Sequence, residues 1–154
     1  MEKELNTKGG DMDRVERAKW HCKTVVKKYR DGETEPYEVK EIDGNALTST
    51  GITAMWDLIV GGGTYAPMNH ANSKLAVYAG GAWVDGVLDV NSPETVTGGK
   101  KWKASWSGSS GDGAWTKWKI YTSTATAWQM NERSEALGSK SGGTWSLEVS
   151  VTLS

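Results

Sequence analysis

The carboxylate side chains are the residues of this sequence whose spacing is most similar to that of a catalytic pair. Asp85 and Asp89 lie four residues apart, and Glu132 and Glu135 flank Arg133. Paired carboxylates can act as general acid and base, or as acid and nucleophile, in glycoside hydrolysis. The surrounding sequence places each of them in a solvated turn or on an outward strand face. We therefore expect these groups to be surface charges and the protein not to be an enzyme.

Nucleophile and metal patterns are equally incomplete. The loop 107–111 (SGSSG) has no Gly-x-Ser-x-Gly elbow between a strand and a helix. Asp11 and Asp13 lack the further oxygen ligands of a calcium loop. The single cysteine, Cys22, and the two histidines are too few for a zinc cage, and Asp57 stands without a partner carboxylate. We expect a buried thiol at Cys22, and neither a metal nor a cofactor.

Tryptophan is the most unusual residue of the composition, with nine Trp and no Phe. Trp rings fill cores and protein interfaces, and they also stack on sugars. Strict alternation puts Trp115 and Trp118 on opposite faces of one strand, so one of them should leave the core. We expect most Trp to fill the core or an interface. The alternative is a glycan or partner contact at Trp83, Trp115 and Tyr121.

Charge is balanced overall but divided unevenly along the chain. The 154 residues carry a net charge of −1, which argues against direct nucleic-acid binding through a basic face. No apolar stretch approaches the ~20 residues that span a bilayer, so we expect no membrane contact. Residues 1–43 hold 21 of the 37 charged side chains. This division predicts a charged N-terminal arm and β-hairpin over 1–43 and a body over 44–154.

The arm segment contains a hairpin signal. Polar and apolar residues alternate over 20–27 and over 37–42, and Asp31-Gly32 between them is a typical hairpin turn. A polar arm of this kind gains order when it folds onto a neighbouring subunit. We predict an interface on the arm and hairpin formed by Arg14, Arg17, Trp20, Lys23, Lys27, Tyr29 and Tyr37.

A helix is predicted over about 46–60. Asn45 is a suitable N-cap, and the glycines 61–63 are a typical stop. The glycines end a helix and lack a following Lys-Ser/Thr, so they are not a phosphate loop. Helical spacing places one apolar face on Leu47, Gly51, Ala54, Met55, Leu58 and Ile59.

The rest of the chain predicts strands and turns. Residues 82–90 are expected to form a bent strand around Asp85-Gly86. The last strand is the clearest, with five apolar residues in strict alternation from Trp145 to Leu153. Seven or eight short strands with glycine-rich turns and one helix predict a mainly β protein, an antiparallel β-sandwich.

Several short motifs, taken in order, resemble a family of small virion structural proteins of tailed bacteriophages. No single motif is specific, and their order along roughly residues 20–154 carries the resemblance. The motifs are 44–47 (GNAL), 51–52 (GI), 56–59 (WDLI), 69–73 (NHANS), 102–106 (WKASW), 113–118 (GAWTKW), 130–133 (MNER), 137–140 (LGSK) and 143–145 (GTW).

The resemblance implies a structural role in a phage particle, assembled in the host cytoplasm. The expected function is a capsid decoration or cement protein that binds the major capsid protein, other virion proteins and further copies of itself as a homo-oligomer. The alternative is a tail or tail-fibre accessory protein, an adhesin that binds host-surface glycan through exposed Trp. The family transfers no catalytic residues.

Overall fold

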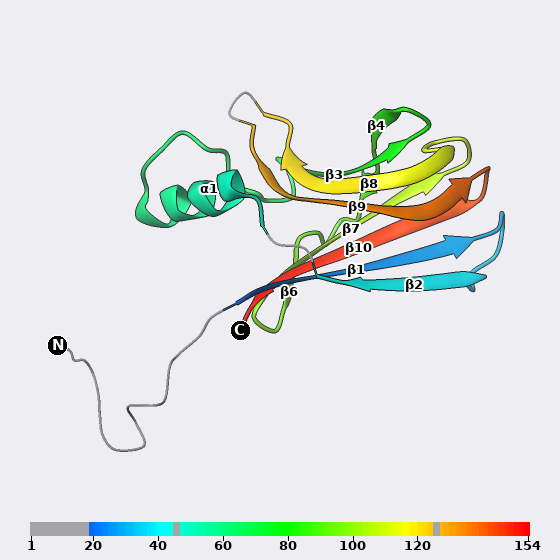
Figure 1. Ribbon diagram of the computed structural model, residues 1–154, viewed down its shortest axis with the longest axis horizontal. Helices are drawn as coiled ribbons and strands as arrows, with labels where there is room; N and C mark the ends of the chain where they lie inside the picture. The colour runs from blue at the N-terminus through cyan, green and yellow to red at the C-terminus, as the bar shows by residue number, and fades with distance from the viewer. Residues whose placement is uncertain (1–18, 45–46, 125–126) are drawn as a thin grey trace, which may run out of the picture.

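The computed structural model describes residues 19–44, 47–124 and 127–154, and it is built mainly of β-strands. Ten strands and one helix follow each other in these residues (Figure 1). They are β1 (Trp20–Tyr29), β2 (Glu38–Asp43), α1 (Ser49–Val60), β3 (Ser73–Ala79), β4 (Ala82–Asp85), β5 (Val87–Leu88), β6 (Glu94–Val96), β7 (Gly99–Ser107), β8 (Gly113–Thr122), β9 (Gln129–Lys140) and β10 (Thr144–Leu153).

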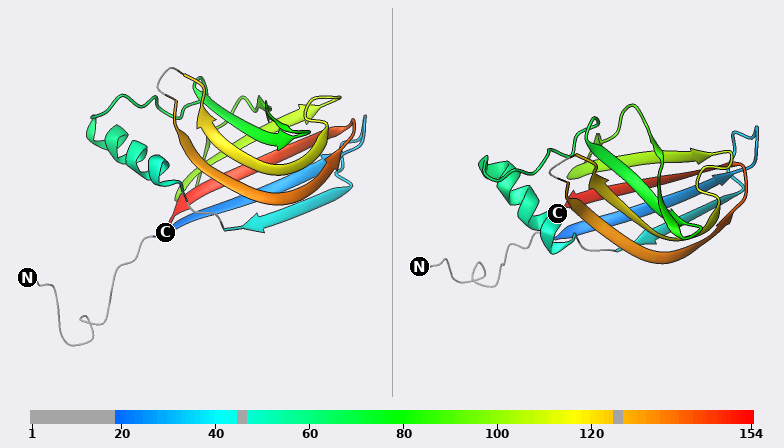
Figure 2. Two further views of the ribbon diagram at one scale, coloured as in Figure 1. Left: turned by 45° about the horizontal axis from the view of Figure 1, so that its top comes forward. Right: turned by 90° about the horizontal axis from the view of Figure 1, so that it is seen from above.

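The strands form two antiparallel sheets that face each other, which confirms the predicted mainly β architecture with one helix. The larger sheet has the order β2-β1-β10-β7-β5, with β6 also paired to β7. The smaller sheet has the order β4-β3-β8-β9. Figure 2 shows the smaller sheet curving over the larger one, with α1 placed at one end of the pair.

The core lies between the sheets and follows the two-residue period of the strands. Trp145, Leu147, Val149 and Val151 of β10 are buried, as the sequence predicted, whereas Leu153 lies at the open end and is half exposed. On β1 the buried positions are Cys22, Thr24, Val26 and Lys28, and the intervening side chains point outward.

The predicted hairpin is present, but it belongs to the body. β1 pairs with β2 on one side and along its whole length with the C-terminal strand β10 on the other, from Trp20↔Leu153 to Tyr29↔Thr144. Its buried face supplies the core of the larger sheet. The hairpin therefore shares one sheet and one core with the rest of the described chain, because β1 lies between β2 and β10. The part of the predicted arm before residue 19 lies outside the described residues.

The helix begins later than predicted and ends where predicted. Thr48 is the N-cap, and its Oγ1 accepts a hydrogen bond from the Gly51 N–H at 2.9 Å. The proposed cap Asn45 lies outside the described residues. Gly61 ends the helix with φ 74°, a left-handed conformation that glycine adopts without strain. A Cβ on Gly51 would lie 2.5 Å from the Met130 carbonyl oxygen, so glycine allows α1 to dock closely on β9.

The predicted bent strand around Asp85-Gly86 is two strands in different sheets. β4 pairs with β3 in the smaller sheet, and β5 pairs with β7 in the larger one. The chain crosses between the sheets at Gly86, where a Cβ would lie 2.7 Å from Cζ2 of Trp106. Glycine is needed here because the core indole occupies the space of a side chain.

Candidate functional site

The carboxylates considered for catalysis do not converge. Asp85 accepts a hydrogen bond from the Tyr121 hydroxyl, and Glu132 accepts one from Gln129. Glu135 pairs with Arg133 and Lys40, and these two cations hold the pKa of its carboxyl below the ordinary value. Over residues 19–44, 47–124 and 127–154 no group of three or more His, Cys, Asp or Glu side chains is placed to hold a metal.

Cys22 is a buried thiol, as predicted. Burial raises its pKa, although a hydrogen bond from Asn131 Nδ2 to Sγ, at 3.2 Å, opposes that effect. The thiol is therefore less ionised at neutral pH than a free cysteine and is a poor nucleophile. None of the helices in the described part of the chain is long and apolar enough to cross a membrane.

The residues predicted for the arm and hairpin interface are not gathered on one surface. Arg14 and Arg17 lie outside the described residues. The outer face of the larger sheet carries Lys23, paired with Glu41, and Lys27, paired with Glu148. Tyr29 lies further along β1, points to the same outer face and is half-buried.

Two aromatic residues of that predicted interface lie apart from the lysines. Tyr37 is exposed in the hairpin loop, with the Arg30 guanidinium 4.3 Å from its ring centroid. Trp20 has the inward register of β1 and stands at the open end of the sandwich. The hairpin therefore presents separate contacts rather than one continuous aromatic and basic surface.

The prediction that Trp115 contacts a ligand is wrong, because its side chain is completely buried. Trp118 is completely buried as well, although strict alternation would separate the two. A bulge at Thr116 explains the difference. The pairing of β8 with both neighbouring strands skips this residue, so Trp115 and Trp118 both point into the core.

The other two residues of the predicted contact, Trp83 and Tyr121, come together on the outer face of the smaller sheet. Trp83 of β4 faces Tyr78 of β3 in an edge-to-face pair, with ring centroids 5.4 Å apart. The Lys119 ammonium lies 4.3 Å from the Trp83 ring and 4.6 Å from the Tyr121 ring. We call Tyr78, Trp83, Lys117, Lys119 and Tyr121 the aromatic–lysine cluster.

Hydrogen bonding fixes the tyrosine of this cluster. Tyr121 Oη donates to Asp85 Oδ1 at 2.7 Å. Burial, and then the carboxylate, raise the pKa of the phenol well above its usual range, so the hydroxyl stays protonated and remains a donor. The Lys117 ammonium lies 4.8 Å from the Tyr78 ring. The cluster thus combines half-buried rings with two cations held over them by cation–π attraction.

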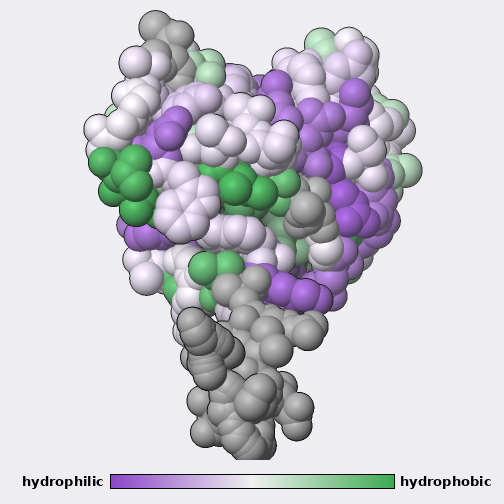
Figure 3. Space-filling view, turned by 60° about the vertical axis from the view of Figure 1, so that its left-hand side comes forward, coloured by the Kyte–Doolittle hydropathy of each residue, from purple (hydrophilic) through white to green (hydrophobic). Residues whose placement is uncertain are grey.

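A separate hollow lies where α1 covers the open end of the two sheets. This apolar cleft has a volume of about 810 Å³. Its walls come from β1, α1, the segment 67–70, the segment 90–93, β7, β9 and β10. Figure 3 looks at this end and shows apolar surface crossing it between hydrophilic regions.

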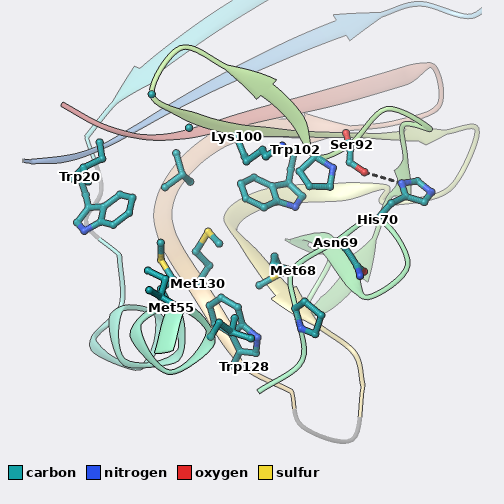
Figure 4. A pocket seen from close by; sticks show the side chains of 18 of the residues that line it. Trp20, Met55, Met68, Asn69, His70, Ser92, Lys100, Trp102, Trp128 and Met130 are labelled. Atoms are coloured by element: carbon teal, nitrogen blue, oxygen red, sulfur yellow. Dashed lines mark hydrogen bonds between the residues drawn. The ribbon is translucent and has the colours of Figure 1, made fainter. Parts of the chain in front are cut away.

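The floor of the apolar cleft is aromatic and sulfur-rich. Figure 4 shows the Trp102 indole extending from β7 toward Met68 and Met130, with Trp128 beneath them and Trp20 across the cleft. The Trp128 indole N–H donates to the Ala66 carbonyl at 2.6 Å. Trp102 is buried as deeply as Trp128, yet its Nε1 donates to no group in the described residues.

Few polar groups reach the apolar cleft, and none of its lining residues is acidic. His70 Nδ1 is 2.8 Å from the Ser92 carbonyl oxygen at one edge (Figure 4). Lys100 stands at the rim, where Nζ donates to Thr95 Oγ1 at 2.8 Å. The cleft therefore offers a hydrogen-bond donor and a cation to an apolar occupant.

Helix α1 exposes a second apolar face beside the cleft. Gly51 and Ala54 face the sheets, and Met55 and Leu58 pack partly against the core. Ile52, Trp56, Ile59 and Val60 are exposed, with Trp56 62% and Val60 72% accessible. The spacing i, i+4, i+7, i+8 makes these four residues one stripe, which we call the outer helix stripe. The sequence prediction had assigned Ile59 to the inner face.

Comparisons of the chain with protein-family models, with curated proteins and with solved structures found no match. The structure itself defines the class: a two-sheet antiparallel β protein with one end-capping helix. Its two candidate sites in the described residues are the apolar cleft, extended by the outer helix stripe, and the aromatic–lysine cluster. Both combine aromatic or apolar side chains with one or two cations.

Proposed function

We propose that the protein is a structural subunit of a tailed-bacteriophage particle, a capsid decoration protein that binds the shell and neighbouring subunits rather than catalysing a reaction. The observation that carries the binding role is the open end of the sandwich. A helix that is apolar on both faces belongs in a buried environment, and a large exposed apolar patch marks a contact with another protein.

The phage context of this proposal rests on the order of the motifs from Gly44 to Trp145 and on their resemblance to small virion proteins. The fold agrees with such a role in a general way, since a rigid β body presents fixed surfaces to its neighbours. The chemistry agrees as well: the carboxylates are dispersed, the thiol is buried, and the accessible aromatic groups lie on surfaces.

The test is the location of the protein in purified particles of the phage that encodes it. Heads and tails are separated, and each fraction is analysed by mass spectrometry. We expect the protein in the head fraction. Recovery from tails alone would reject the capsid assignment and identify a tail subunit, and absence from both fractions would reject the structural role.

The aromatic–lysine cluster favours a second candidate function, the binding of an acidic host-surface glycan by a tail accessory protein. Trp83 offers a ring to a sugar, and Lys117 and Lys119 offer charge to a carboxylate on it. These are the residue types that such recognition needs, and the structure brings them together from β4 and β8.

We expect Trp83→Ala to weaken binding to an array of uronic-acid and sialylated glycans about tenfold, because ring stacking and the cation–π contacts are lost together. The matched control is Tyr37→Ala, which removes an exposed ring that also carries a cation, but in the hairpin loop. Equal binding by wild type and Trp83→Ala, or no binding by either, would reject the glycan function.

A further inference from the structure

The apolar end has the features of a self-complementary interface. It carries a projection, the outer helix stripe, and directly beside it a hollow, the apolar cleft. A two-fold interface uses the same surface patch on both subunits, so each subunit must offer both shapes on one face. We propose that the occupant of the apolar cleft is the C-terminal half of α1 from a second copy of this chain, inserted reciprocally in a dimer.

Hydrogen-bonding groups on the two shapes are complementary. The Trp102 Nε1–H in the cleft is buried and has no acceptor in the described residues, and buried polar groups are rarely left in that state. At the end of α1 the carbonyls of Asp57 and Leu58 accept from the N–H groups of Gly62 and Gly61. The next two carbonyls, of Ile59 and Val60, receive no hydrogen bond from the described part of the chain. An inserted helix end thus brings acceptors close to the Trp102 Nε1–H, which they reach once the cleft side chains that cover this buried atom move aside.

Charge is complementary as well. The C-terminal end of a helix carries partial negative charge, and the last turn of α1 has no basic side chain to offset it. The ionisable residues that line the cleft are His70 and Lys100, and no acidic side chain lines it. A helix end from a second copy would therefore enter a region with a cation at its rim and, beneath its floor, a buried indole N–H that has no acceptor in the described residues.

Apolar surface is matched in the same way. Trp56 and Val60 would leave water and contact the aromatic and methionine side chains of the cleft, where Met adapts to irregular shapes. Val90, which is 83% exposed at the cleft rim, and Leu153 would be covered by the same contact. This inference deepens the proposed function, since it names the partner of the docking end, and it rests on that end being a docking surface.

The test measures the association of the full-length protein by sedimentation equilibrium. We expect the wild type to form a dimer, and Val60→Glu to raise the dissociation constant at least about 100-fold, because it places a carboxylate in an apolar contact. The matched control is Val87→Glu. Val87 is as exposed as Val60 (79% against 72%) but lies on β5, away from the cleft, so this variant should dimerise like the wild type.

A second variant tests the hydrogen bond. Trp102→Phe keeps an aromatic ring on the cleft floor but removes the N–H, and we expect it to raise the dissociation constant about two- to tenfold. Circular dichroism and thermal unfolding check that each variant is folded. A wild type that stays monomeric up to about 1 mM, or a Val60→Glu protein that dimerises normally, would overturn the proposal.

A photo-crosslinking residue at position 60 identifies what contacts the helix. We expect a crosslinked dimer in which the attachment maps to cleft residues such as Met68 or Val90. Attachment within residues 1–18, or to a region outside the cleft, would overturn the assignment. These measurements use purified protein, whereas the phage assignment is tested on particles, so either can fail without the other.

Discussion

Replacing Trp115 with alanine will lower the free energy of unfolding by about 4 kcal/mol, a loss typical of a buried Trp→Ala change. The Trp115 ring is completely buried and lies edge-to-face against Trp106 and Trp145, with centroids 4.9 and 5.0 Å away. Its Nε1 also donates to the Gly111 carbonyl at 2.7 Å. Alanine would leave a cavity between the sheets and an unpaired buried carbonyl.

Urea unfolding followed by circular dichroism measures this loss. The matched control is Trp83→Ala, which removes the same side chain from the outer face of the smaller sheet and should cost less than about 1 kcal/mol. The Trp83→Ala protein will then be stable enough for binding experiments, whereas the Trp115→Ala protein will not. Equal stabilities of the two variants would contradict the burial that we assign to Trp115.

The two-residue alternation of the strands was predictable from the sequence, because a sheet with one buried face forces it. The last strand, with Trp145 and Val149 on its buried face, was identified correctly for this reason. The hairpin between β1 and β2 and the glycine stop at Gly61 were also identified, since Asp-Gly turns and glycine C-caps have local conformational causes.

Features that depend on tertiary pairing were not predictable in this way. The bulge at Thr116 interrupts the alternation of β8, and nothing local distinguishes this residue from its neighbours. Gly86 was recognised as a bend, but the change of sheet is enforced by Trp106, which is distant in the sequence. The integration of the hairpin into the body depends on β10, at the opposite end of the chain.

The candidate sites were predictable only in part. Trp83 and Tyr121 were singled out, but their proximity requires β4, β3 and β8 to lie side by side. The apolar cleft was not predicted, because its walls come from segments scattered from β1 to β10. The adjoining outer helix stripe did have a local signal, because the spacing of Ile52, Trp56 and Val60 marks a second apolar face on the helix.

Two lysines are buried, which the composition of the chain did not predict. Lys28 has the inward register of β1, and its ammonium donates to the Leu137 carbonyl at 2.6 Å, pairs with Glu38, and lies 4.3 Å from the Trp145 ring. Lys140 is buried near the same end of the sandwich, opposite the cleft. The charged residues of this chain are therefore not all solvated, and two of them lie in the core at the end opposite the cleft.

Of these two buried lysines, we expect Lys140 to contribute more to the stability of the protein. Its side chain is fully buried, with Nζ 2.6 Å from the Gly108 carbonyl oxygen and 3.1 Å from Asp112 Oδ1. We expect Lys140→Met to lower the free energy of unfolding by about 1 kcal/mol, because the Gly108 carbonyl and Asp112 lose a charged donor but both remain accessible to water. The matched control is Lys74→Met, a half-exposed lysine of β3 that should change stability by less than about 0.5 kcal/mol.

The same variant should change the response of stability to acid. The hydrogen bond from Lys140, followed by that from the Gly142 N–H, lowers the pKa of Asp112 in the folded protein. The stabilising contribution of this carboxylate is therefore complete above the unfolded pKa of about 3.9 and is lost as the pH falls through the lower folded value. Urea unfolding of wild type and Lys140→Met between pH 7 and pH 2 measures it. The difference in stability between the two should shrink toward the acid end, and a difference that grows with acid would show that Asp112 is not the partner of Lys140.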